Sequence, residues 1–333
     1  MKQGLRCSYG QAIREGYRYL LQEYPEVFVI GQGLWSPWYV GSSMEDLEVE
    51  FGKDRVIDTP VSEQACTGLV VGAAIAGKKP IVVHPRMDFM ILAVDQMVTQ
   101  AAKWSSMFAR RSTAPILVRG IINRGGEQGA QHSQALHAWF AHIPGLRVVM
   151  PWSVADARDL LVSGTLIDDP VLYIDDKWLY DDEAEIPPEP NLRAVLEGPK
   201  LLRQGSDVTI VGVGFTTRLV IDASNLLAER SIESDVFDLR VLNPLNVDLI
   251  VESVTRTGRL VVVDGGWRTC GIAGEVIAAV CESVAPTAFH APPKRVVLQD
   301  TPAPTSRPLE EEYYPRTTCV IRAVEQVLGA MTL

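Results

Sequence analysis

Cysteine is scarce in this chain, and its spacing forms no recognisable framework. The 333 residues include five cysteines, an odd number, and no two of them form a C-x-x-C motif. This pattern argues against a disulfide scaffold and against a zinc site. Long apolar runs are also missing, since no stretch approaches the about 18 apolar residues of a transmembrane helix. The N-terminus turns polar too early for a signal peptide. We therefore expect a cytoplasmic protein that makes no contact with a membrane.

Positive charge is in deficit. Lys and Arg together number 31 and Asp and Glu 41, so the formal net charge is −10. A nucleic-acid binder should carry a basic surface, so this balance argues against that function class. Hydrophobic residues make up 47% of the chain and charged residues 22%, which is typical of a packed globular protein. The length indicates about two domains.

Helix-like and strand-like segments alternate along the whole chain. Apolar residues recur at helical spacing in some segments, and short apolar runs typical of buried parallel strands lie between them. The expected helices are 8–24, 62–76, 90–104, 154–166, 217–230, 248–257, 274–284 and 318–328, with one more that starts at His132. The expected strands are 27–30, 80–84, 116–119, 148–150, 171–174, 207–213, 234–239, 260–264 and 296–298. This order predicts an α/β fold with two doubly wound domains.

An acidic, proline-rich stretch divides the two series of elements. It begins near Asp181 and continues through Pro187, Pro188 and Pro190. Such a composition is typical of an exposed linker. We expect a first domain over 1–185, a linker over 186–196 and a second domain over 197–333.

Glycine-rich loops do not match the common nucleotide-binding motifs. Residues 212–218 follow a strand and open a helix, but they lack the third glycine of the dinucleotide fingerprint. The chain contains neither a Walker motif nor a G-x-S-x-G elbow, which argues against a P-loop enzyme and a serine hydrolase. The missing glycine argues against a stand-alone dehydrogenase. Binding of NADH by the isolated chain would support that hypothesis again.

Three polar residues lie where strands end or helices begin. Glu63 starts an apolar helix, His132 follows the glycine-rich loop 125–129, and His84 ends a strand. Taken singly, Glu63 complements the helix dipole and His132 is a capping or packed histidine. In an open α/β sheet, however, the carboxyl ends of strands line the ligand crevice.

Taken together, these segments resemble a known family over nearly the whole chain. The motifs, in chain order, are RVIDTPVSEQ (55–64), DF (88–89), AVDQ (93–96), AAK (101–103), QHSQ (131–134), PGLRVV (144–149), GSDVTIV (205–211), DLR (238–240), NPL (243–245), TGR (257–259) and DTP (300–302). Their joint order is similar to the β subunit of the thiamine diphosphate-dependent 2-oxoacid dehydrogenases. The resemblance implies a pyrimidine-binding domain followed by a transketolase C-terminal-like domain.

The resemblance assigns roles to particular residues. The cofactor reacts through a carbanion, and its own aminopyrimidine removes the proton as the imino tautomer. The family's carboxyl group, which shares a proton with the far pyrimidine nitrogen, corresponds to Glu63. The aromatic residue that stacks on the pyrimidine corresponds to Phe89, and the active-site histidine to His132. Gln32, beside the cofactor, stands where the family usually has an acid.

The resemblance also implies a partner. The Gly-Asp-Gly…Asn motif that binds the metal and the diphosphate in thiamine enzymes is missing from this chain. The thiamine diphosphate and its Mg²⁺ would therefore be shared with an α subunit in an α2β2 assembly. A lipoyl acyltransferase component is the family's usual acceptor. Trp35, Trp38 and Trp139 are candidates either for the subunit interface or for core packing.

One departure from the family pattern concerns the substrate. The family's aromatic-rich stretch is replaced here by residues 83–89, which include His84 and Arg86. Arg is suited to bidentate recognition of carboxylate or phosphate, so we expect these two side chains to face a polar or anionic substrate, unless they face solvent or the partner. Two further readings stay open: a two-subunit transketolase or acyloin-forming carboligase, and a non-catalytic regulatory homologue.

Overall fold

The computed structural model describes residues 4–329. The outermost residues of the two expected domains, 1–3 and 330–333, lie outside this range. The chain divides into two compact units, and each is described by itself. The first comprises residues 1–124 and 140–197, and the second comprises 125–139 and 198–333. The second unit therefore takes in a segment from the middle of the first expected domain.

The first unit is built on a parallel sheet with the strand order β6-β7-β5-β4-β2-β3. These strands are β2 (Val27–Gln32), β3 (Val56–Thr59), β4 (Lys79–His84), β5 (Leu117–Ile122), β6 (Arg147–Val149) and β7 (Val171–Asp176). The central strands β4, β5 and β7 are almost entirely buried. Such burial on both faces explains their continuous apolar sequence.

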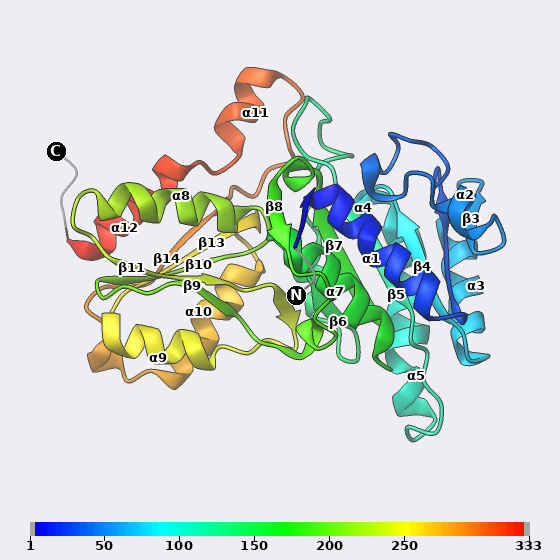
Figure 1. The fold of residues 1–333 in the computed structure, drawn as a ribbon. Helices are drawn as coiled ribbons and strands as arrows, with labels where there is room; N and C mark the ends of the chain where they lie inside the picture. The colour runs from blue at the N-terminus through cyan, green and yellow to red at the C-terminus, as the bar shows by residue number, and fades with distance from the viewer. Residues whose placement is uncertain (1–3, 330–333) are drawn as a thin grey trace. The chain divides into compact units, whose positions relative to one another are not determined.

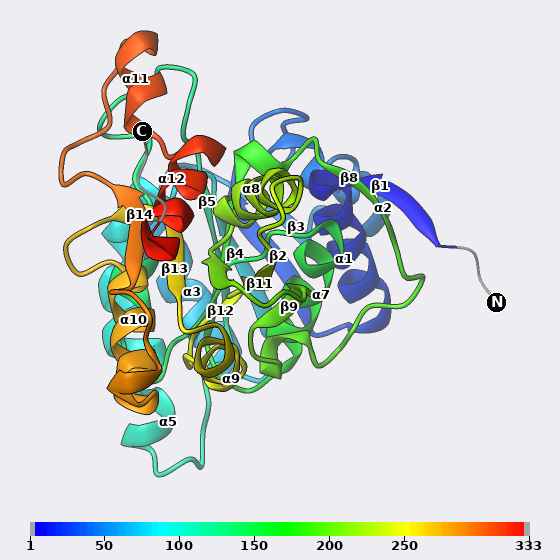
Figure 2. The same ribbon diagram turned by 90° about the vertical axis from the view of Figure 1, so that its left-hand side faces the viewer.

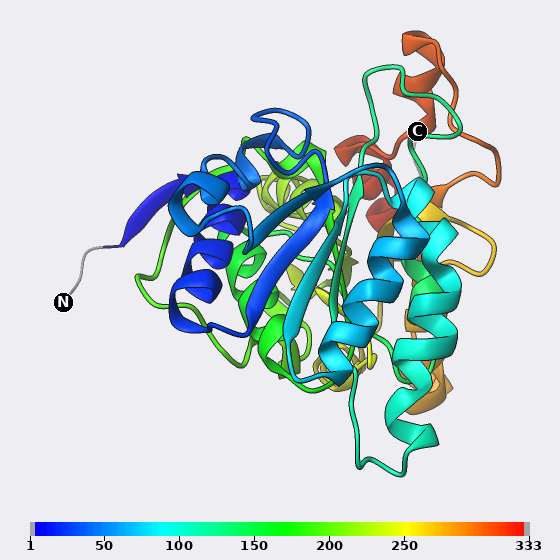
Figure 3. The ribbon, with the colours of Figure 1, turned by 90° about the vertical axis from the view of Figure 1, so that its right-hand side faces the viewer.

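Helices cover both faces of this sheet (Figures 1 and 3). The unit contains α1 (Tyr9–Glu23), α2 (Leu47–Phe51), α3 (Glu63–Ile75), α4 (Met87–Met90), a π-helical segment (Asp95–Ala101), α5 (Ala102–Met107) and α7 (Val154–Leu166). Helix α1 packs beside α7 on one face, while α3 and the segment 87–107 lie side by side on the other. The N-cap of α1 is Ser8, whose hydroxyl accepts from Gln11 N–H while Gln11 Oε1 accepts from Ser8 N–H. This reciprocal pair is a capping box, and it explains where the helix starts.

A buried ion pair ties β5 to β7. Arg119 donates to Asp175 from Nε at 3.0 Å and from Nη2 at 2.8 Å, and both side chains are fully buried. Three hydroxyls complete the cluster, those of Tyr180, Ser43 and Tyr17, at 2.8, 2.9 and 3.4 Å from the guanidinium. Burial and the neighbouring Asp175 raise the pKa of Tyr180 well above its ordinary value, so the phenol stays protonated and donates to Asp175.

The second unit is built on a sheet with the order β14-β13-β10-β11-β9, in which only β9 runs antiparallel. Its strands are β9 (Lys200–Arg203), β10 (Val208–Gly212), β11 (Ser234–Asp238), β13 (Leu260–Trp267) and β14 (Lys294–Leu298). Its helices are α8 (Thr216–Ala228), α9 (Asp248–Thr257), α10 (Ile272–Ser283), α11 (Arg307–Tyr313) and α12 (Thr317–Leu328). Helices α8 and α12 cover one face, and α9 and α10 the other (Figure 2). Both sheets have the α/β architecture that the sequence predicts.

Other short elements complete the two units. They include β1 (Leu5–Ser8), β8 (Glu183–Ile186), β12 (Val241–Asn243), α6 (His137–Ala141) and several 3₁₀ helices of one turn. β8 pairs antiparallel with β1, so part of the acidic stretch is an ordered strand. Ala194 and Val195, within the expected linker, are buried. A helix starting at His132 was expected, and this prediction was wrong, because α6 begins only at His137.

Three predictions from composition can be compared with this structure. All five cysteines are free thiols, as their spacing indicates. Within residues 4–329, no helix has both the length and the apolar character that crossing a membrane requires. Trp35, Trp38 and Trp139 are all exposed, with Trp38 the most so at 77%, and none of them packs in the core.

Candidate active site

A small cavity opens at the carboxyl ends of three adjacent strands of the first unit. It is partly open, has room for little more than one water molecule (about 10 Å³), and is lined by Gly31, Gln32, Thr59, Ser62, Glu63, Cys66, Val82, Val83 and His84. Gly31 in β2 lies opposite Asp58 of β3 and Val83 of β4. A Cβ at Gly31 would lie 2.5 Å from the Val83 carbonyl oxygen, so only glycine lets β2 and β4 approach this closely. The cavity lies at the sheet edge where ligands of open α/β folds bind.

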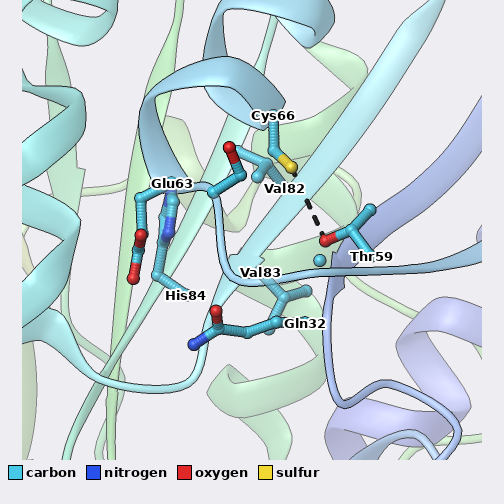
Figure 4. A pocket seen from close by; sticks show the side chains of 9 residues that line it. Gln32, Thr59, Glu63, Cys66, Val82, Val83 and His84 are labelled. Atoms are coloured by element: carbon cyan, nitrogen blue, oxygen red, sulfur yellow. Dashed lines mark hydrogen bonds between the residues drawn. The ribbon is translucent and has the colours of Figure 1, made fainter.

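Glu63 is the only carboxylate among the cavity-lining residues. It is the first residue of α3, and only 8% of its surface is exposed. No residue within 4–329 donates a hydrogen bond to its carboxylate. Burying a charged group without a partner is costly, so the arrangement suits a ligand that supplies the missing hydrogen-bonding group. Glu63 and His84 both line the cavity, and their side chains are labelled in Figure 4.

His84 is the last residue of β4 and is held by Thr67. The Thr67 hydroxyl donates its single proton to the Glu63 carbonyl oxygen at 2.8 Å, and the same oxygen lies 3.1 Å from His84 Nε2. Because the hydroxyl proton is already used, Nε2 must be the donor, so we assign the Nε2–H tautomer with a lone pair on Nδ1. Burial lowers the pKa of His84 to about 4. The imidazole is therefore neutral at pH 7.

Other polar groups border the same cavity. Gln32, at the end of β2, is half-buried and offers both an amide donor and an amide acceptor. Cys66 Sγ lies 3.5 Å from the Thr59 hydroxyl, the interaction drawn in Figure 4. The motif-based prediction did not single out Cys66 or Thr67. The signal was available, because they follow Glu63 by three and four residues and so share its face of α3.

The predicted site residues divide into three groups. Glu63, Gln32 and His84 line one cavity. Arg86 and Phe89 belong to the same unit but are not among its lining residues: Arg86 precedes α4, and the half-buried Phe89 lies within it. His132 belongs to the second unit, whereas Glu63 belongs to the first. The catalytic role of His132 therefore stays a prediction.

The segment that carries His132 is fastened within the second unit. Glu127 N–H donates to the Glu310 carboxylate at 3.0 Å, and Arg307 N–H donates to the Glu127 carboxylate at 3.2 Å. At the end of the segment, His137 Nε2 lies 2.9 Å from Asp264 Oδ1, and both side chains are fully buried. These contacts explain why residues 125–136 form an ordered loop rather than a helix.

The cavity residues carry the polar groups that would bind an aminopyrimidine ring. Such a ring presents ring nitrogens and an exocyclic amino group, so it needs both acceptors and donors. The cavity supplies a carboxyl group without a donor, a neutral imidazole, an amide and hydroxyls. Within residues 4–329, no group of three or more His, Cys, Asp or Glu is arranged to hold a metal ion.

Comparison with known proteins gives the family. Residues 6–181 match the family model of the transketolase pyrimidine binding domain, and residues 199–320 match that of the transketolase C-terminal domain. The pyruvate dehydrogenase E1 component subunit beta of Rickettsia bellii is 37% identical over 320 residues, which cover 95% of this chain and 98% of that protein. The mitochondrial subunit of Bos taurus is 33% identical, covering 98% of this chain and 91% of that protein.

A solved structure shares the fold. It is described as a split gene transketolase, inactive beta4 tetramer, and it matches with a TM-score of 0.75 at 23% identity, covering 97% of this chain and 98% of that chain. The relatives match over nearly the whole chain, which confirms the resemblance found in the sequence. The chain therefore belongs to the transketolase-like family that contains the β subunits of the pyruvate dehydrogenase E1 component.

Proposed function

We propose that this chain is the β-type subunit of a two-component thiamine diphosphate-dependent enzyme that decarboxylates a 2-oxoacid and transfers the resulting acyl unit to an acceptor. The observation that carries the proposal is the buried Glu63 carboxylate, which faces a cavity without a donor from the described chain. The family membership supports it. An α-type partner would supply the diphosphate and Mg²⁺ site, in an α2β2 assembly.

Bound thiamine diphosphate would supply a carbanion that adds to the carbonyl carbon of the substrate. Glu63 would hold a proton on a carboxylate oxygen and share it with a ring nitrogen of the aminopyrimidine. His84 would stay neutral and offer its Nδ1 lone pair, because Nε2–H is engaged by Thr67. Gln32 would orient the ring through its amide, and the side walls formed by Val82 and Val83 would exclude water.

Two further residues are proposed on the family resemblance. Phe89 would stack on the pyrimidine, and His132 would move protons or stabilise charge near the substrate. The exposed tryptophans Trp35, Trp38 and Trp139 are candidates for the surface that meets the α partner, since large exposed aromatic residues are enriched at interfaces. A lipoyl acyltransferase component would be the default acceptor, in a cytoplasmic setting.

A second candidate is a two-subunit transketolase or an acyloin-forming carboligase, which would make the chain part of a transferase. The shared fold with the split gene transketolase and the cationic Arg86 favour it. A screen of both 2-oxoacids and ketose phosphates, with the products identified, would separate the candidates. A transketolase would cleave a ketose phosphate without releasing carbon dioxide, and a carboligase would release carbon dioxide but form an acyloin instead of transferring an acyl unit.

The test is co-expression with the α-like partner, followed by assays of thiamine diphosphate-dependent turnover. Glu63→Gln keeps the shape of the side chain but cannot share a carboxyl proton, so it should lower kcat by at least about 100-fold, as expected for loss of a general acid–base group. Glu23→Gln, at the exposed end of α1, is the matched control and should leave turnover unchanged. Full activity of Glu63→Gln would refute the assigned role, and turnover without thiamine diphosphate would refute the proposed function.

A further inference from the structure

Cationic residues follow the ends of three adjacent strands of the first unit. Strands β4, β5 and β7 are neighbours, with His84 opposite Gly120 and Ile122 opposite Asp176. Arg86 follows β4 by two residues, Arg124 follows β5 by two, and Lys177 immediately follows β7. Parallel strands that end together place these side chains along one edge of the sheet. The same edge carries the Glu63 cavity, since β4 borders both.

One of the three cations is already neutralised. Arg124 Nε lies 2.8 Å from Asp176 Oδ2, both side chains are buried, and the guanidinium stands over the Trp178 ring at 5.7 Å. Asp176 also accepts from Trp178 N–H at 3.0 Å. Arg124 therefore has a structural partner and is not available to bind a ligand anion.

Arg86 and Lys177 have no such partner. No carboxylate within residues 4–329 lies at ion-pair distance from either of them. Arg86 Nη2 donates at 3.1 Å to the Asn123 amide oxygen, with that amide turned to face it. Lys177 Nζ reaches only the Tyr39 carbonyl oxygen, at 3.5 Å. Both contacts are to neutral groups, so neither cation has an ion-pair partner of its own. Asp175, which is already paired with Arg119, offsets part of the positive charge around Lys177.

The two charges act on one another. Lys177 is half-buried, and burial first and the Arg86 charge second lower the pKa of its ammonium group. Two half-buried cations that repel each other lower the stability of the empty protein. An anion bound between them would relieve that repulsion and gain charge-assisted hydrogen bonds from both.

We propose that Arg86 and Lys177 together form a binding site for a second anionic group of the substrate, a carboxylate or a phosphate, beside the Glu63 cavity. The proposal rests on the proposed function and specifies its substrate class: a 2-oxoacid or ketose that carries an anionic group away from the reacting carbonyl. Neighbouring strands lie about 5 Å apart, so β4 and β7 place the anion within one or two strand spacings of the cavity. The sequence alone suggested Arg86 but not Lys177.

Binding can be measured without turnover. Isothermal titration of the assembled complex with glutarate and, separately, with inorganic phosphate should detect binding of at least one of them, and comparison of the two distinguishes a carboxylate site from a phosphate site. Arg86→Gln and Lys177→Gln should each weaken that binding by roughly 10- to 100-fold, the effect of losing a charged hydrogen bond. Lys177→Arg should retain most of it. The control is Lys78→Gln, an exposed lysine next to the amino end of β4, which should change nothing.

Kinetics with matched substrates give the second readout. The probes are 2-oxoglutarate against 2-oxopentanoate, and fructose 6-phosphate against fructose. Arg86→Gln and Lys177→Gln should raise KM for the member of the preferred pair that carries the additional anionic group, and leave KM for the other member unchanged. Equal losses on both members, failure of the wild-type complex to bind either anion, or loss of α-subunit assembly in the variants would overturn the anion site. Thiamine diphosphate-dependent turnover of the substrates that lack the additional anionic group would then leave the proposed function standing.

Discussion

Acidification should destabilise the first unit through His84. Burial lowers the pKa of this imidazole to about 4, against 6.5 for an exposed histidine. As the pH falls, the unfolded chain therefore takes up the proton first. The stability that the neutral imidazole contributes is complete above about pH 6.5 and is lost progressively between pH 6.5 and pH 4. One pKa unit corresponds to about 1.4 kcal/mol, so the loss approaches about 3 kcal/mol at pH 4.

The assay is urea denaturation of the full chain at a series of pH values from 7.5 to about 4.5. Carboxylates also titrate in this range, so the quantity of interest is the difference between the wild type and His84→Gln, which keeps an N–H donor for Thr67 but does not titrate. The free energy of unfolding of the wild type should fall below that of the variant as the pH drops. His142→Gln, at an exposed histidine, provides the control and should parallel the wild type. A difference between wild type and His84→Gln that stays constant with pH would refute the assignment of a buried, neutral His84.

Three further substitutions test the packing that holds the site. Thr67→Val removes the acceptor of His84 Nε2–H and should lower the free energy of unfolding by about 1–3 kcal/mol. The control Thr255→Val loses only an exposed hydrogen bond to its own helix and should change that energy little. Equal effects of the two substitutions would contradict the hydrogen bond assigned to His84. Arg119→Met leaves the buried Asp175 carboxylate without its ion-pair partner and should lower the free energy of unfolding by about 3–5 kcal/mol. An unchanged thermal denaturation midpoint would contradict this. Gly31→Ala forces a methyl group against the Val83 carbonyl oxygen and should lower the free energy of unfolding by about 1–3 kcal/mol. A urea denaturation curve identical to that of the wild type would contradict this.

Most of the regular elements could be predicted from apolar periodicity. Helix α7 was predicted with its observed bounds, 154–166, and α1 within one residue at each end. Both begin at a serine N-cap that the sequence displays. The helix predicted from His132 was wrong, because the fate of that segment depends on long-range partners. Glu310 and Asp264 lie more than 120 residues after the residues that they bind, Glu127 and His137. A local sequence pattern cannot predict such partners.

The candidate site was predicted only in part for a related reason. Family motifs identified Glu63, Gln32 and His84, and strand order brings them into one cavity. Thr67 acts through a hydrogen bond whose partner lies on another element, so its role requires the structure. Lys177 was missed because its significance comes from β7 ending in the same sheet as β4, which is a fact of topology rather than of local sequence.

The segment 125–139 has a consequence for how the chain can be cut. Because the second unit includes this segment, the backbone passes between the units near residues 124 and 139 as well as near 197. A fragment ending at 185 or 197 would carry His137 away from Asp264 and leave a buried imidazole without its carboxylate. We therefore expect each half expressed alone to be less stable than the same residues in the whole chain, because the cut separates residues 125–139 from the rest of the second unit. Swapping the second unit between relatives would likewise require exchange of the inserted segment.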